Sequence, residues 1–70
     1  MKNWIKVERA KRGMTQDDLA KAIGVSRYAI AAIESGRYEA SVGMAIDVAR
    51  YFNKKVEDIF FRTDADIPPL

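Results

Sequence analysis

The sequence has 70 residues and a mass of 7.9 kDa, enough for one small domain that buries about 60% of the surface exposed by its unfolded chain. It contains no cysteine and no histidine, which excludes a disulfide framework and thiolate metal sites and removes the commonest general base. We therefore expect no metal, no cofactor and no catalytic activity. With 49% hydrophobic and 31% charged residues, the composition is typical of a folded, soluble domain.

Positive charge is concentrated in the first half of the chain. Residues 1–37 contain eight Lys or Arg and four Asp or Glu, a net charge of +4, whereas residues 38–70 contain four and six, a net charge of −2. A basic half suits an anionic partner such as nucleic acid, although solvated surfaces also produce such imbalances. No apolar run reaches the roughly 18 residues of a membrane span, and no signal-peptide core follows the first residues. We expect a cytoplasmic protein that does not enter a membrane.

The first predicted helix spans residues 2–12 and the second spans residues 16–23. Gly13 follows the first helix in the position of a C-terminal cap. Thr15 precedes the second helix as an N-cap residue, and Asp18 follows three residues later, which makes a short-armed capping box. The sequence therefore marks where the first helix ends and where the second begins.

The third predicted helix spans residues 27–35 and is separated from the second by only three residues, Gly24-Val25-Ser26. Ser26 is a good N-cap for this helix, and Gly36 follows its end. Ile30 and Ile33 form the inner edge of the helix. The side chains that face away from this edge are those of Arg27, Tyr28, Ala31 and Ala32.

A fourth helix is predicted between the N-cap residue Ser41 and Asn53. Its apolar residues repeat at i, i+3, i+4 and i+7, the pattern of a core-facing helix: Ala45, Val48, Ala49 and Phe52. A short fifth helical turn is expected at residues 57–61. Residues 62–70 form a C-terminal tail that contains two prolines and cannot continue as a helix.

Two helices joined by a three-residue turn that contains glycine match the DNA-binding helix-turn-helix. Spacing alone fits a plain five-helix bundle equally well. Three segments are more specific: MTQDDLA at residues 14–20, IGVSR at residues 23–27 and AAIESGRY at residues 31–38. In these segments the chain resembles the phage-repressor or Xre family of helix-turn-helix transcriptional regulators, in particular its minimal single-domain members.

The resemblance covers about residues 2–61. It implies an all-α, five-helix, lambda-repressor-like DNA-binding domain over residues 1–61, in which the helix at residues 27–35 lies in the major groove of double-stranded DNA. Five positions match those that reach the bases: Ser26, Arg27, Tyr28, Ala31 and Ala32.

Of these residues, Arg27 can bind guanine O6 and N7 in a bidentate way, and a phosphate contact is its closest rival role. Tyr28 has four readings, namely stacking on a base, packing on a thymine methyl group, binding a phosphate, or simple surface packing. The family often has longer polar side chains at the positions of Ala31 and Ala32. An alanine can touch a thymine methyl group but forms no hydrogen bond with a base, so specificity is modest or rests on DNA shape.

The resemblance assigns phosphate contacts to three residues: Gln16, Arg37 and Tyr38. Gln16 also helps to position the recognition helix. In the alternative, Arg37 and Tyr38 are simply solvent-exposed polar residues of the loop and do not contact DNA. Arg9 and Glu34 match a structural ion pair between the first helix and the end of the third. If this pair is buried, breaking it singly costs about 3 to 5 kcal/mol.

Three apolar residues lie at or beyond the end of the last predicted helix: Phe61, Ile67 and Leu70. We expect them to form a homodimer interface, because two helix-turn-helix units reading a palindromic operator give more specificity than one. In the alternative, Ile59 and Phe60 complete the core of a monomer while the tail frays. Ile46 and Tyr51, on the outer side of the fourth helix, are the next candidates for an interface.

The predicted function is sequence-specific transcriptional regulation, most simply repression by occupying an operator, since 70 residues leave no room for a ligand-sensing domain. The alternative is an antitoxin-type interaction module that holds a toxin with its C-terminal segment and binds DNA secondarily. An enzyme is the least favoured class. Asp17 and Asp18 are adjacent in the second helix, so their carboxylates do not face each other as a catalytic pair would, and both suit the positive end of the helix dipole.

Overall fold

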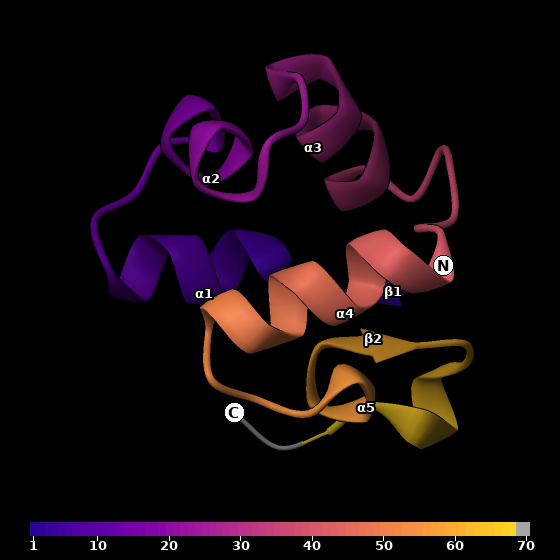
Figure 1. The fold of residues 1–70 in the computed structure, drawn as a ribbon. Helices are drawn as coiled ribbons and strands as arrows, with labels where there is room; N and C mark the ends of the chain where they lie inside the picture. The colour runs from indigo at the N-terminus through magenta and orange to yellow at the C-terminus, as the bar shows by residue number, and fades with distance from the viewer. Residues whose placement is uncertain (69–70) are drawn as a thin grey trace.

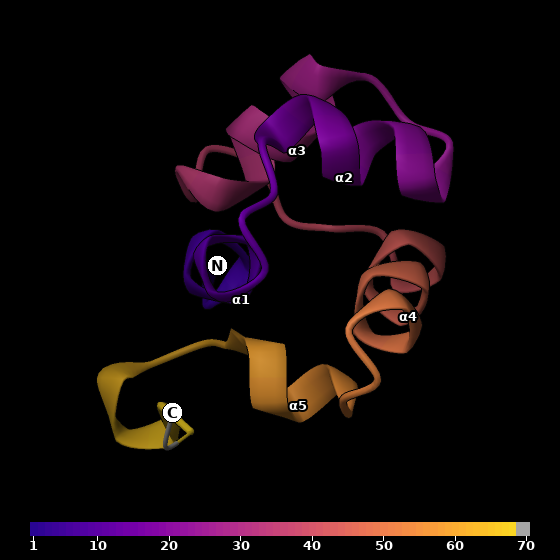
Figure 2. The ribbon, with the colours of Figure 1, turned by 90° about the vertical axis from the view of Figure 1, so that its left-hand side faces the viewer.

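The computed structural model describes residues 1–68 and is mostly helical. In chain order its elements are β1 (Lys2–Asn3), α1 (Ile5–Lys11), α2 (Gln16–Ile23), α3 (Arg27–Glu34), α4 (Val42–Tyr51), α5 (Val56–Ile59), β2 (Phe60–Phe61) and the short 3-10 turn η1 (Asp64–Asp66). In Figure 1, α2 and α3 lie above α1 and α4, and α5 lies below them. The view along α1 in Figure 2 has α4 across from it, so the helices surround a common centre. The predicted five-helix, all-α fold is confirmed.

Capping residues set the starts of α2, α3 and α4. Thr15 Oγ1 accepts a hydrogen bond from the Asp18 N–H at 3.0 Å, and Asp18 Oδ2 accepts one from the Thr15 N–H at 2.9 Å, which completes the predicted capping box. Ser26 and Ser41 cap the next two helices in the same way, each accepting at 3.1 Å from the N–H three residues later. α4 ends at Tyr51, and two residues later Asn53 has a positive φ of 57°.

The core lies where the inner faces of the five helices meet. The apolar residues at the centre come from every helix and from β2: Ile5, Leu19, Ala20, Ile30, Ile33, Val48, Ala49, Phe52, Ile59 and Phe60. The predicted inner edges of the third and fourth helices are therefore confirmed. No helix within residues 1–68 is long and apolar enough to cross a membrane.

The first and last predicted helices are each too long, because their outer residues pair as strands. β1 and β2 are antiparallel, with Lys2 opposite Phe61 and Asn3 opposite Phe60. The Trp4 N–H donates to the Ile59 carbonyl at 2.8 Å, which continues the pairing. The predictions of a helix at residues 2–12 and a helical turn at residues 57–61 are therefore wrong at residues 2–4 and 60–61, since the backbone groups of these residues are satisfied across the chain.

The expectation that Phe61 lies beyond the monomer core is also wrong. Phe61 is only 6% exposed, and its ring centre lies 5.5 Å from that of Trp4. The Trp4 Nε1–H donates to the Pro68 carbonyl at 3.1 Å, which holds the described part of the tail against the N-terminal residues. Ile67 is 41% exposed, and Leu70 lies outside the described residues.

Glu8, in the middle of α1, has only 2% of its surface exposed although it carries a carboxylate. Arg12 Nη1 lies 2.8 Å from the Glu8 carboxylate, Lys54 Nζ lies 3.3 Å from it and Lys11 Nζ lies 3.6 Å from it. Burial raises the pKa of the Glu8 carboxyl, but hydrogen bonds from Arg12 and Lys54 and the charges of Lys54 and Lys11 outweigh burial, so the pKa lies below its ordinary value. Glu8 thus ties α1 to the segment after α4.

We expect Glu8→Gln to lower the free energy of unfolding by about 2 kcal/mol at pH 7, because it removes charge-assisted hydrogen bonds of a buried group. Since the folded-state pKa is lowered, this contribution is present above the unfolded-state pKa, near 4.5, and is lost as the pH falls through the folded-state pKa. Urea unfolding at pH 7 and at about pH 3 measures the free energy of unfolding of both proteins. The difference in this free energy between the wild type and the variant should shrink at the lower pH.

Asp47→Asn is the matched control, because Asp47 is exposed on α4 and its replacement should change stability by less than about 0.5 kcal/mol. A difference between wild type and Glu8→Gln that stays the same at both pH values would contradict the role given to the Glu8 charge.

Candidate nucleic-acid interface

α2 and α3 are joined by the short turn that the sequence predicts. Gly24 has a positive φ of 77°, a backbone conformation that residues other than glycine rarely adopt. The Val25 N–H donates to the Ala20 carbonyl at 3.0 Å, and Val25 packs against the core. Ser26 then begins α3 as its N-cap. Local backbone chemistry therefore fixes the angle at which α3 leaves α2.

One face of α3 is turned away from the core. Ile30 and Ile33 are buried on the inner face, whereas Tyr28 is 74% exposed on the outer face. Tyr28, Ala31, Ala32 and Ser35 stand at i, i+3, i+4 and i+7, so they form one stripe along the helix and its C-cap. Of the five predicted base-contacting residues, Ser26 has a side chain that forms a hydrogen bond within the described chain, because its hydroxyl oxygen accepts from the Ala29 N–H.

The loop after α3 folds back onto the same face. Gly36 has a φ of 79°, which turns the chain so that the Ala32 carbonyl accepts from the Arg37 N–H at 3.1 Å and from the Tyr38 N–H at 3.4 Å. Tyr38 is 63% exposed. The structure therefore brings the predicted phosphate-contacting residues Arg37 and Tyr38 beside the predicted base-contacting residues of α3.

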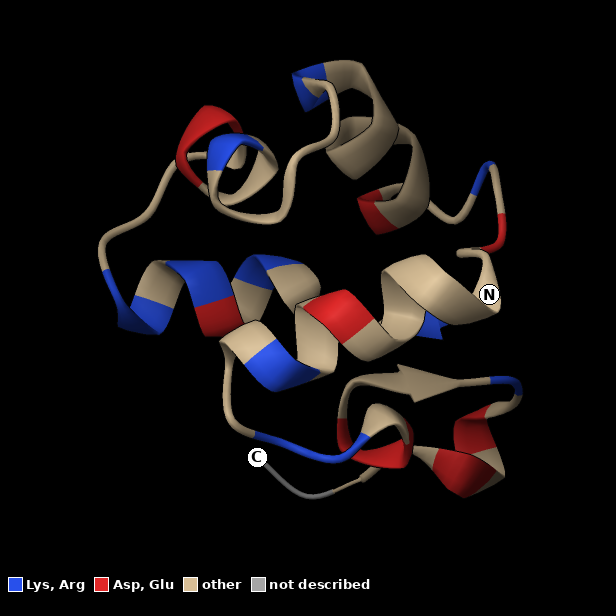
Figure 3. Ribbon diagram, in the orientation of Figure 1, with Lys and Arg blue, Asp and Glu red and all other residues tan. Residues whose placement is uncertain are grey.

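Positive charge flanks this face at both ends. Arg27 lies at the start of α3, with its guanidinium carbon 4.8 Å from the centre of the Tyr28 ring, and Arg37 lies in the loop after the helix. In Figure 3, Lys and Arg colour the start of α3 and the loop after it, while Asp and Glu colour α5 and the segment that follows β2, and also the last turn of α3, the same loop and α2. Arg27 and Arg37 therefore offer a cation to an anionic partner at each end of α3.

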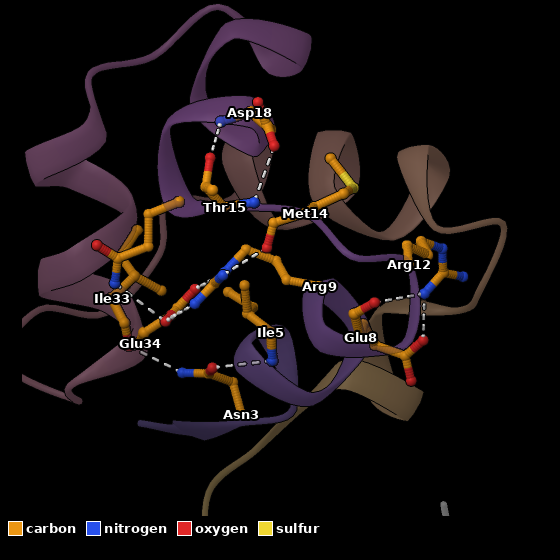
Figure 4. A network of polar contacts seen from close by, with 11 residues as sticks. Asn3, Ile5, Glu8, Arg9, Arg12, Met14, Thr15, Asp18, Ile33 and Glu34 are labelled. Atoms are coloured by element: carbon orange, nitrogen blue, oxygen red, sulfur yellow. Dashed lines mark hydrogen bonds and ion pairs between the residues drawn. The ribbon is translucent and has the colours of Figure 1, made fainter.

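The predicted ion pair between Arg9 and Glu34 is present and largely buried. Arg9 Nε donates to Glu34 Oε2 at 2.6 Å and Arg9 Nη2 donates to Glu34 Oε1 at 2.9 Å, while the two side chains are only 12% and 6% exposed. Arg9 Nη1 also donates to the Met14 carbonyl at 2.8 Å (Figure 4). The hydrogen bond with Glu34 raises the pKa of Arg9. One guanidinium thus joins α1, the loop before α2, and the end of α3.

Gln16, the first residue of α2, belongs to the same network. Its Nε2 donates to Glu34 Oε1 at 3.2 Å, which agrees with the expectation that it helps to set α3. Its second amide hydrogen stays available for a phosphate, since an amide nitrogen carries two donors.

Asn3 is a residue of this network that the sequence analysis missed. Its Nδ2 donates to the Ile33 carbonyl at 2.8 Å, and its Oδ1 accepts from the Ile5 N–H at 3.2 Å (Figure 4). Asn3 precedes Trp4, the N-cap residue of α1, and its contact with the Ile5 N–H two residues later is of the kind that asparagine side chains form with nearby backbone. The contact with Ile33 joins residues 30 positions apart, and no local signal indicates it.

Comparison with known proteins gives consistent matches over most of the chain. The family model described as helix-turn-helix matches residues 5–59. An uncharacterized HTH-type transcriptional regulator of Methanocaldococcus jannaschii is 50% identical over 64 residues, which cover 91% of this chain and 97% of the relative. A second, from Archaeoglobus fulgidus, is 43% identical over 67 residues, 96% of each chain. A third, YgzD of Bacillus subtilis, is 41% identical over 61 residues, 87% of this chain and 92% of its own.

We expect Arg9→Ala and Glu34→Ala each to lower the free energy of unfolding by about 3 to 5 kcal/mol, because each leaves a largely buried charge without its partner. The double variant should cost at least about 1 kcal/mol less than the sum of the two single variants. Urea unfolding of all four proteins gives this difference.

The exposed pair Asp17 and Lys21, with side chains 51% and 79% exposed, is the matched control. Alanine at both positions should change stability by no more than about 1 kcal/mol. Additive effects at Arg9 and Glu34 would contradict their direct coupling.

Proposed function

Because the chain belongs to the helix-turn-helix family of the Xre and lambda-repressor type, we propose that it is a sequence-specific repressor of transcription that occupies an operator in double-stranded DNA. The observation that carries this proposal is the outer face of α3. It is exposed, it is flanked by Arg27 and Arg37, and it is held in place by a buried ion pair. Since the proposed partner is double-stranded DNA, we propose a cytoplasmic location.

In this proposal α3 lies in the major groove. Arg27 binds guanine O6 and N7 in a bidentate way, which reads one base pair. Gln16, Arg37 and Tyr38 bind phosphates on either side of the groove, which fixes register and orientation without reading sequence. The support for this division is geometric, since Arg27 extends from the start of α3 and Arg37 and Tyr38 come from the loop that is folded against the end of α3.

We propose that the active form is a homodimer on a palindromic operator. One helix-turn-helix contacts few base pairs, and two copies on half-sites about 34 Å apart read the same face of the duplex one turn apart. Phe61 is buried in the monomer and takes no part. Ile67, which is 41% exposed next to the N-terminal residues, remains as the described tail residue for the interface.

Binding to duplex DNA should weaken steeply with salt, because phosphate contacts release counterions. With about 6 phosphate contacts per dimer, the logarithm of affinity against the logarithm of salt concentration should fall with a slope of about −5. Fluorescence anisotropy with a labelled duplex measures this slope. A flat salt response, or no binding at low salt, would contradict the proposal, and binding that requires a second protein would favour the antitoxin-type alternative.

Arg27→Ala should weaken binding to the selected operator by about 1 to 3 kcal/mol and relax the preference at one base pair per half-site. Arg37→Ala should weaken binding to all sequences about equally and lower the salt slope by about 1 per subunit. Titrations with the operator and with an unrelated duplex separate the two effects, and circular dichroism checks that both variants fold. The two roles are assigned wrongly if the variants behave alike.

Sedimentation equilibrium should find the wild type as a dimer at micromolar concentration and Ile67→Glu as a folded monomer. This monomer should keep non-specific DNA affinity and lose most specific affinity, because the second half-site no longer benefits from effective concentration. Ile46→Glu tests the alternative interface on α4, since Ile46 is also 41% exposed, and this variant should leave the dimer intact if the tail forms it. A dimer that survives Ile67→Glu and is lost in Ile46→Glu would place the interface on α4.

A further inference from the structure

The outer face of α3 and the loop after it border an open hollow of about 450 Å³, which we name the α3 hollow. Six residues line it: Tyr28, Ala31, Ala32, Ser35, Arg37 and Tyr38. Ala31 and Ala32 are its smallest side chains and form its floor, while the two tyrosines are large and mostly exposed. The volume exceeds that of a methyl group, so the edge of a base, not only one substituent, fits into it.

The hollow exists because short side chains on α3 lie between long side chains from the first turn of α3 and from the loop after it. Tyr28, Ala31 and Ala32 share a helix face through their spacing of three and four residues. The Ala32 carbonyl then accepts from the backbone N–H groups of Arg37 and Tyr38, which holds the loop beside the end of α3. The aromatic side chain of Tyr38 thus lines the same hollow as that of Tyr28, one from the loop and one from the first turn of α3.

The floor offers apolar contact and no hydrogen bond. Alanine methyl groups neither donate nor accept, and the Ser35 hydroxyl already donates to the Ala32 carbonyl at 2.9 Å. Polar base edges in the major groove lose solvation when they face such a floor without a partner. The apolar group on these edges is the C5-methyl of thymine, and 5-methylcytosine carries a methyl at the same ring carbon.

The flanking charges direct a duplex onto the hollow. Arg27 is held over the Tyr28 ring at one end, and Arg37 lies on the rim at the other. Two cations on either side of an uncharged floor attract the polyanionic duplex, and in the proposed function Arg37 binds a phosphate while Arg27 binds a base edge beside the hollow.

We propose that the α3 hollow binds the C5-methyl group of a pyrimidine in duplex DNA, with the methyl on Ala31 and Ala32 and the ring edges of Tyr28 and Tyr38 on either side. The inference rests on the proposed function and adds the chemical group that the recognition face selects. The shared ligand chemistry is a 5-methylpyrimidine, supplied by thymine or by 5-methylcytosine.

The experiment starts from sites selected by the intact protein from a random duplex pool, in which each thymine of the consensus is replaced singly by deoxyuridine. This change removes one methyl group and leaves every hydrogen-bonding group of the base in place. At the position that faces the hollow we expect affinity to fall about fourfold, the effect of one buried methyl group. Replacements outside the site are the internal control and should have no effect.

A second arm places cytosine or 5-methylcytosine, each paired with guanine, at that same position. The methylated duplex should bind about fourfold more tightly than the unmethylated one. Equal affinities would overturn the claim that the methyl group is what the hollow reads. This arm distinguishes thymine from modified cytosine as the source of the methyl.

Ala31→Ser and Ala32→Ser test the floor from the protein side. Each should bring the ratio of affinities for thymine and deoxyuridine from about four towards one, because a hydroxyl replaces the apolar contact. Ala10→Ser, at an exposed position of α1, is the matched control and should keep the ratio.

The outcomes separate the two claims. No binding to any duplex would defeat the proposed function together with this inference. Tight, salt-dependent binding with no deoxyuridine-sensitive position would overturn the inference alone.

Discussion

The ion pair between Arg9 and Glu34 is the constraint on which the geometry of the recognition face depends. α3 has eight residues, too few for a helix to be stable by itself in water. Its buried side chains Ile30 and Ile33 anchor the inner face, but apolar contacts alone permit small shifts along and around the helix axis. The bidentate contact from Arg9 fixes the last turn, because two parallel hydrogen bonds to one carboxylate tolerate little change in direction.

The partners of this pair extend the constraint to the rest of the domain. Arg9 binds the Met14 carbonyl and Gln16 binds Glu34, so the start of α2 is set by the same two charges. Asn3 reaches the Ile33 carbonyl from β1, which links the paired strands to the end of α3. The outer stripe of α3 and the loop folded against it are therefore presented by a rigid support and not by an isolated helical hairpin.

Local signals in the sequence predicted most of the helices, and contacts between distant residues account for what it did not predict. Thr15, Ser26 and Ser41 cap helices through atoms only three residues away, so their roles follow from the nearby sequence. The pairing of Lys2 with Phe61 joins the two ends of the chain, and nothing near either residue indicates it. The α3 hollow likewise depends on how the loop turns at Gly36, so five of its six lining residues were predicted as site residues but Ser35 and the hollow itself were not.

Charge is also arranged in a way that composition alone does not give. Basic residues lie at the two ends of α3, with Arg27 and Arg37, along α1, and after α4, with Lys54 and Lys55. Lys54 lies 3.3 Å from the buried carboxylate of Glu8, so part of its charge is neutralised within the fold. The acids of α5 and of the segment after β2 lie on the far side from α3 (Figure 3), which disfavours the approach of phosphates there.

The central claim is that duplex DNA binds the outer face of α3. An NMR titration of the labelled protein with a selected duplex tests it most directly, because each backbone amide reports on its own surroundings. The account predicts that the amides of residues 26–38 shift most, and that those of residues 50–55 and of α5 change little. The largest shifts at Arg50, Lys54 and Lys55, with the amides of α3 unchanged, would contradict it.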